Sequence, residues 1–199
     1  MKGKDFSGMG ETVPDRGLAL RRTVVLIGMM GAGKTAIGRA LATRLGAELK
    51  DSDAEIVDAA QLTIAEIFER YGEAFFREKE TQVIERLLDG PSCILSTGGG
   101  AWLAERNRQI LTGKAAVLWL DADLELLWNR VRHKTTRPLL RTEDPKATLT
   151  EIFNARQPVY ALAPLRLKVQ PGWSIDQTAD AVMDVLIENG AVARTEDAG

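Results

Sequence analysis

Residues 28–35 constrain the fold of this chain more than any other stretch of its sequence. They read GMMGAGKT and match the pattern G-x-x-x-x-G-K-[ST] without a mismatch. The apolar, β-branched run 23–27 before them predicts a buried strand, and the spacing of Ile37, Leu41 and Leu45 after them predicts a helix. A strand, a glycine-rich loop and a helix in this order are typical of a loop that binds phosphate groups.

The chemistry of this loop assigns roles to its last two residues. Backbone N–H groups of a tight glycine turn and the positive end of the following helix both favour an anion. Lys34 can reach the β- and γ-phosphates of a nucleotide, and the Thr35 hydroxyl can ligate Mg²⁺. We therefore expect a nucleoside triphosphate and Mg²⁺ at this loop. A glycine turn that binds nothing is the alternative.

Composition and charge exclude several other classes of protein. The 199 residues are 45% hydrophobic and 27% charged, which is typical of a globular protein. A net charge of -2 gives no bulk attraction to nucleic acid or to an anionic membrane. Cys93 is the single cysteine, and no apolar run approaches the roughly 20 residues of a membrane helix. We expect a cytoplasmic monomer without nucleic-acid or membrane partners.

The order of the predicted elements indicates an α/β fold. Four further strands are predicted: a short segment at 47–53 that ends in paired acids, and the segments 93–97, 115–120 and 165–169. Helical patterns separate them. Alternating strands and helices favour a parallel five-stranded sheet with helices on both faces. We expect one domain over residues 23–190, a flexible N-terminal extension over 1–22 with some order near 18–20, and a frayed C-terminal tail over 191–199. A docking role for the extension is the alternative.

Two acidic residues follow the predicted second strand. Asp51 and Asp53 are two residues apart, so an extended backbone would place both carboxylates on the same side. At the carboxyl end of a strand, one could hold Mg²⁺ through water while the other accepts a hydroxyl proton. The alternative is that Asp51 or Ser52 caps the next helix.

A run of three glycines and a basic segment mark two further candidate sites. Residues 98–100 follow the predicted third strand, and three glycines are costly unless another group approaches the backbone closely. A plain turn is the alternative. The basic segment 130–141 breaks the helical period, which favours a lid over the nucleotide, with a solvated loop as the alternative.

The motifs taken together are more specific than any one of them. In order and spacing, the chain closely resembles the shikimate kinase family. The resemblance covers about residues 23–188 and rests on these motifs: GMMGAGKT at 28–35, Asp51-Ser52-Asp53, Phe76-Arg77-x-x-Glu80, Gly98-Gly99-Gly100, Arg137-Pro138-Leu139-Leu140 and Arg156-x-Pro158-x-Tyr160.

The resemblance implies a P-loop kinase fold like that of the nucleoside monophosphate kinases. It also implies ATP-dependent phosphorylation of the 3-hydroxyl of shikimate, in the biosynthesis of chorismate and the aromatic amino acids. Another small-molecule P-loop kinase, such as a gluconate kinase, is the runner-up. A nucleotide-dependent switch is the alternative from a different class, but a switch has no use for two arginines directed at a carboxylate.

The resemblance also implies residue roles. Asp53 would act as base or orienter of the reacting hydroxyl, with Lys34 and the lid residue Arg137 as the other catalytic groups. Thr35 and Asp51 would hold Mg²⁺. The shikimate site would consist of Asp53, Arg77, Gly98, Gly99, Gly100 and Arg156, with both arginines on the carboxylate. The nucleotide site would consist of Gly31, Ala32, Gly33, Lys34, Thr35, Ala36, Arg130 and Arg137, with Arg130 against the adenine.

One position departs from the family pattern. Members usually carry a second hydroxyl residue after the loop's Ser or Thr, and this chain has Ala36. That hydroxyl contacts the α-phosphate, so we expect somewhat reduced nucleotide affinity.

Overall fold

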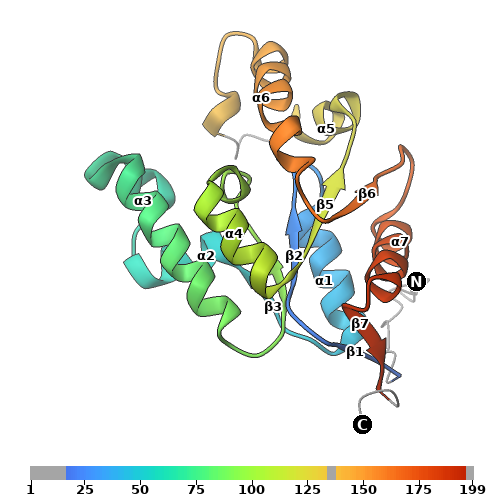
Figure 1. Cartoon of the computed structure of the whole chain (residues 1–199). Helices are drawn as coiled ribbons and strands as arrows, with labels where there is room; N and C mark the ends of the chain where they lie inside the picture. The colour runs from blue at the N-terminus through green and yellow to red at the C-terminus, as the bar shows by residue number, and fades with distance from the viewer. Residues whose placement is uncertain (1–16, 134–137, 196–199) are drawn as a thin grey trace, which may run out of the picture.

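The computed structural model describes residues 17–133 and 138–195. Its main feature is a five-stranded sheet in the order β3-β4-β2-β5-β6, in which all neighbouring strands are parallel (Figure 1). The predicted fold class is confirmed. The strands are β2 (Val24–Ile27), β3 (Leu49–Asp51), β4 (Ile94–Ser96), β5 (Ala116–Asp121) and β6 (Leu165–Lys168).

Helices cover both faces of the sheet. On one face, α1 (Lys34–Leu45) packs against α7 (Ile175–Glu188), and on the other α3 (Ile64–Leu88) packs against α4 (Glu105–Lys114) (Figure 1). The central strands β2 and β5 are buried along their whole length, which explains their uninterrupted apolar sequences. The remaining helical elements are α2 (Ser52–Ala60), η1 (Ala101–Leu103), α5 (Leu124–Val131), η2 (Pro138–Leu140) and α6 (Pro145–Tyr160).

Local capping chemistry sets several helix boundaries. Thr63 and Glu66 form a capping box at the start of α3, and Ser174 and Gln177 form another at the start of α7. Both boxes follow the sequence pattern of a Ser or Thr with Glu or Gln three residues later. Gly72 interrupts α3 with φ 80° and ψ 172°, where a side chain would be strained.

The expectation that Asp53 lies at the end of an extended strand is wrong. Asp53 does not extend the second strand, because Asp51 ends β3 and caps α2, so Asp53 lies in the first turn of that helix. At the end of β5, Asp121 is fully buried and pairs with Arg166 and Lys168 of β6.

The described chain continues beyond the expected domain boundaries. Strand β1 (Leu18–Leu20) pairs antiparallel with β7 (Val192–Arg194) in a separate two-stranded sheet. Ala191 and Val192 are buried, so this part of the C-terminal tail packs on the fold instead of fraying. Residues 1–16 and 196–199 lie outside the described residues. Within the described ranges, no helix is long and apolar enough to span a membrane.

Candidate active site

The phosphate loop joins β2 to α1 and presents the beginning of that helix. Gly33 is the N-cap of α1 with φ 101°, and no side chain among the described residues caps the helix there. The free N–H groups of a first helical turn are the ordinary site for an anion, so the loop fits a nucleotide phosphate. Thr35 and Ala36 follow in the first turn, Thr35 exposed and Ala36 half-buried.

Two cations lie against the loop. The Nζ atom of Lys34 donates to the carbonyl oxygens of Gly28 at 2.8 Å and Met29 at 3.2 Å. From α5, the Nη1 atom of Arg130 donates to the carbonyl oxygens of Gly31 at 3.3 Å and Ala32 at 3.2 Å. Burial lowers the pKa of the Arg130 guanidinium. Two of the three cations predicted to bind the nucleotide, Lys34 and Arg130, therefore lie against one loop.

Asp51 combines a capping role with a position beside the candidate base. Its Oδ1 atom accepts from the backbone N–H of Asp53 at 3.0 Å and of Ala54 at 3.4 Å. The capping alternative is thus correct for Asp51. Both hydrogen bonds use Oδ1, so capping does not occupy the second carboxylate oxygen. A carboxylate and the hydroxyl of Thr35 are oxygen donors of the kind that Mg²⁺ prefers, so the donor set fits this ion.

Asp53 lies among the other charges of the site. Burial raises the pKa of its carboxyl, and the negative charge of Asp51 raises it further. The positive charges of Lys34 and Arg77 act in the opposite direction, without reversing the shift. A carboxylate with a raised pKa between two cations has the character of a general base.

The three glycines that follow β4 form a surface without side chains, which we call the glycine platform (residues 98–100). A Cβ atom on Gly98 would lie 2.6 Å from Oδ1 of Asp53, and one on Gly100 would lie 2.7 Å from Nη1 of Arg77. None of the three has a positive φ. At Gly98 and Gly100, close approach by functional side chains, and not backbone conformation, therefore favours glycine.

Arg77 reaches the platform from α3 with two carboxylates beside it. Its Nη1 atom contacts Oε2 of Glu80 at 2.9 Å, and its Nη2 atom contacts Oε1 of Glu73 at 3.2 Å. Burial acts to lower the pKa of Arg77, but the two carboxylates outweigh it and raise the pKa. Glu80 is only 1% exposed, and burial raises its pKa against the opposing effect of Arg77. The ion pairs with Glu73 and Glu80 hold the Arg77 guanidinium in one orientation.

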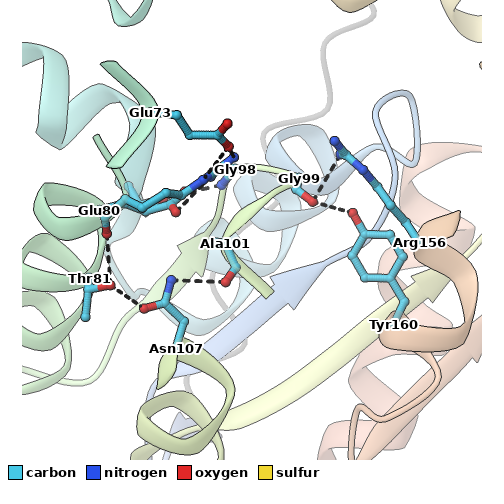
Figure 2. A network of polar contacts seen from close by, with 11 residues as sticks. Glu73, Glu80, Thr81, Gly98, Gly99, Ala101, Asn107, Arg156 and Tyr160 are labelled. Carbon is cyan, nitrogen blue, oxygen red and sulfur yellow. Dashed lines mark hydrogen bonds and ion pairs between the residues drawn. The ribbon is translucent and has the colours of Figure 1, made fainter. Parts of the chain in front are cut away.

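Arg156 and Tyr160 reach the platform from α6, on its other side. Figure 2 shows both side chains pointing toward the carbonyl oxygen of Gly99, to which Tyr160 Oη donates at 2.5 Å and Arg156 Nη1 at 3.4 Å. Burial raises the pKa of Tyr160, which keeps its hydroxyl a donor. The indole N–H of Trp102 also donates to the Val159 carbonyl oxygen at 2.8 Å. Together these bonds attach α6 to the platform.

The structure thus brings together most of the residues that the sequence selected. Asp53, Arg77 and Arg156 surround the glycine platform, and a Cβ on Gly99 would lie 3.8 Å from the Gly28 carbonyl oxygen of the phosphate loop. Arg137 lies outside the described residues. Sequence reasoning missed Glu73, although its spacing of four residues from Arg77 on one helix is a usable signal.

A parallel sheet with a phosphate loop beside a small polar site is typical of P-loop kinases that act on small molecules. A sequence model of the shikimate kinase family matches residues 30–187. The shikimate kinase of Ruegeria pomeroyi is 57% identical over 176 residues, covering 88% of this chain and 90% of that one. The shikimate kinase of Cereibacter sphaeroides is 53% identical over 178 residues, covering 89% of each chain. The chain belongs to the shikimate kinase family.

Solved structures agree with this assignment. The shikimate kinase from Acinetobacter baumannii in complex with shikimate has a TM-score of 0.78 and 36% identity, over 90% of this chain and 96% of that one. A gluconokinase from Sinorhizobium meliloti has a TM-score of 0.55 and 15% identity, over 86% of this chain and 94% of that one. That likeness concerns the fold alone, so the gluconate kinase alternative is not favoured.

Proposed function

We propose that this protein transfers the γ-phosphoryl group of ATP to the 3-hydroxyl of shikimate, giving shikimate 3-phosphate and ADP. Shikimate is a small ring with one carboxylate and several hydroxyl groups. The observation that carries the proposal is the pair of arginines, Arg77 and Arg156, on different helices at the two sides of the glycine platform. A planar guanidinium suits a carboxylate because it can form two parallel hydrogen bonds.

The reaction follows from the arrangement of charges. The substrate hydroxyl oxygen attacks the γ-phosphorus, the bond from that phosphorus to the ADP oxygen breaks, and Asp53 takes the hydroxyl proton. The raised pKa of Asp53 makes it a stronger base than an ordinary aspartate once it is ionised. Lys34 supplies positive charge to the phosphates, and Arg137 is proposed to do the same for the transferring group.

The phosphate loop and its neighbours would bind the nucleotide and its metal ion. Thr35 and Asp51 would hold Mg²⁺, which would neutralise phosphate charge when bound. The loop residues 31–36 would bind the phosphates, and Arg130 would lie against the adenine. We also propose that the enzyme is a cytoplasmic monomer, and that its product enters chorismate and aromatic amino-acid biosynthesis.

One assay tests the proposed function directly. ADP release should depend on both ATP and shikimate, and gluconate in place of shikimate should give only the background rate. Shikimate-independent ADP release, or equal turnover with gluconate, would refute the proposal.

Lysine in place of either arginine should raise the KM for shikimate by at least about tenfold. Truncating one partner of a desolvated charge pair costs about 2–5 kcal/mol, and lysine restores the charge without the planar fork. Steady-state kinetics on Arg77→Lys and Arg156→Lys should show little change in the KM for ATP. Arg86→Lys is the control, because Arg86 lies on the same helix as Arg77 in an exposed ion pair with Glu55.

A second substrate checks which group the arginines recognise. A shikimate analogue with a neutral amide in place of the carboxylate should be a poor substrate for the wild type. In the Arg77→Lys and Arg156→Lys variants, the rate with this amide analogue should fall much less than the rate with shikimate. Equal use of shikimate and the amide would show that the carboxylate is not the recognised group.

A single methyl group on the glycine platform should impair shikimate use without unfolding the protein. The nearest atoms to a Cβ on Gly100 belong to the flexible end of the Arg77 side chain, at 2.7 and 2.8 Å, so that side chain can move aside. We expect Gly100→Ala to keep a melting temperature near that of the wild type and to raise the KM for shikimate about tenfold or more, since displacements near 1 Å cost up to about 10²-fold in rate.

Gly113→Ala is the matched control for that change. Gly113 lies in α4, and a Cβ atom added to it would meet open space within the described part of the chain. The control should keep wild-type kinetics and gain about 0.5–1 kcal/mol in stability, as alanine usually does in a helix. Unchanged shikimate kinetics in Gly100→Ala would show that the Arg77 guanidinium does not act from its observed position.

A further inference from the structure

A buried asparagine on α4 connects two parts of the candidate shikimate site. Asn107 is 0% exposed, and its side chain lies between α3 and the segment that follows the glycine platform (Figure 2). Its Oδ1 atom accepts from the Thr81 hydroxyl at 2.7 Å, and its Nδ2 atom donates to the Ala101 carbonyl oxygen at 3.0 Å.

Both hydrogen-bond partners of Asn107 lie next to residues of the candidate carboxylate site. Thr81 lies one helical turn after Arg77, and its hydroxyl also lies 3.0 Å from the Arg77 carbonyl oxygen. Ala101 follows Gly100, the platform residue that the Arg77 guanidinium covers most closely. Asn107 therefore joins the backbone turn that carries Arg77 to the backbone beneath its guanidinium.

We propose that Asn107, acting through Thr81 and Ala101, is a positioning residue that sets where Arg77 lies above the glycine platform. The inference rests on the proposed function, because it assigns Asn107 to recognition of the substrate carboxylate. Its effect is on the substrate arginine and not on the phosphate loop, which belongs to other elements of the fold.

The two hydrogen bonds of the Asn107 side chain require an amide at this position. One partner is a carbonyl oxygen, which only accepts, and the other is a hydroxyl that donates. A primary amide offers a donor and an acceptor on one rigid plane and satisfies both. Aspartate would place a second acceptor against the Ala101 carbonyl oxygen, and leucine would leave two buried polar groups without their partner.

The sharpest test removes the hydroxyl of Thr81 while keeping the shape of the side chain. We expect Thr81→Val to raise the KM for shikimate about tenfold and to leave the KM for ATP within about twofold, as small displacements of a positioning group can do. Thr81→Ser restores the hydroxyl and should return the KM for shikimate toward that of the wild type. Asn107→Asp should resemble Thr81→Val, and circular dichroism should show that all variants are folded.

Thr178→Val provides the matched control. The Thr178 hydroxyl donates to the Ser174 carbonyl oxygen at 2.8 Å, four residues earlier in the chain, which is the same spacing as that between Thr81 and Arg77. Thr178 is also buried but lies on α7, on the opposite face of the sheet. Its replacement by valine should leave both KM values unchanged.

A double-mutant comparison separates positioning from general loss of structure. In an Arg77→Ala background, Thr81→Val should cause no further increase in the KM for shikimate, because its effect passes through Arg77. In an Arg156→Ala background the full increase should remain. The same increase in both backgrounds, or none in the wild-type background, would overturn the inference. A wild type without shikimate-dependent ADP release would instead refute the proposed function, and the inference with it.

Discussion

Replacing Asp53 with asparagine is expected to lower kcat by about 10²–10⁴-fold while making the folded protein more stable at neutral pH. The activity falls because an amide cannot accept the hydroxyl proton, and positioned general bases contribute about this factor. The stability rises because the fold disfavours the ionised carboxylate, as burial and the neighbouring Asp51 raise its pKa. Initial rates and thermal unfolding on the same sample measure both effects.

The pH dependence of the stability gain has a definite sign. Below the ordinary aspartate pKa of 3.8, the carboxyl is protonated in the folded and unfolded states alike, so it costs the wild type nothing. As the pH rises from that value through the raised pKa of the folded protein, the unfolded state releases its proton more readily and the wild type loses stability. The difference in melting temperature between Asp53→Asn and wild type should therefore widen with pH and then level off.

The same pKa governs the activity of the wild type. Since the base must be ionised, kcat/KM should fall as the pH drops through a value above 3.8. Asp58→Asn is the control, because Asp58 is an exposed carboxylate on the same helix. It should change neither the rate nor the pH dependence of stability. Near-normal kcat in a folded Asp53→Asn variant would exclude Asp53 as the base.

The fold could be predicted from the sequence because its strongest signals are local. The runs that become β2 and β5 are apolar without interruption, and the glycine loop with its helix fixes the first βα unit. Capping boxes at Thr63 and Ser174 mark helix starts within four residues of sequence. Strands β1 and β7 lack such a signal, because each has three residues and depends on a partner from the other end of the chain.

Asp51 and Asp53 show where a local pattern becomes ambiguous. Two acids separated by one residue fit an extended strand end and also a helix cap. The structure ends β3 at Asp51 and begins α2 at Ser52, so Asp53 comes from a helix and not from a strand. The chemistry expected of the pair remains possible, since Asp51 still raises the pKa of Asp53 across this turn.

The glycine platform was predictable in kind but not in detail. A run of three glycines indicates only that some group approaches the backbone closely. The family resemblance places Asp53, Arg77 and Arg156 in the same site, and the packing of α2, α3 and α6 shows which glycine each of them approaches. Tyr160 has no local signal for its role either, because its partner is the Gly99 carbonyl oxygen, 61 residues away in the chain. Backbone acceptors of this kind leave no pattern in the sequence.

Replacing Lys34 with alanine is expected to reduce kcat by about 10³-fold or more in a protein that still folds. A fixed cation beside the charge that develops on a transferring phosphoryl group contributes effects of this size. The variant also loses two hydrogen bonds to the Gly28 and Met29 carbonyl oxygens, so we expect a loss of about 1–2 kcal/mol in stability. Initial rates, circular dichroism and thermal unfolding measure these quantities.

The Lys34→Ala variant also tests whether the charge of Lys34 acts on the pKa of Asp53. Lys34 lowers the pKa of Asp53, so its removal should raise that pKa further and move the acidic limb of the residual activity to higher pH. Lys146→Ala, which breaks an exposed ion pair with Glu125, should change neither the rate nor this limb. A residual pH profile identical to that of the wild type would show that Asp53 does not supply the titrating group. Near-normal turnover in folded Lys34→Ala would exclude the loop lysine from phosphoryl transfer.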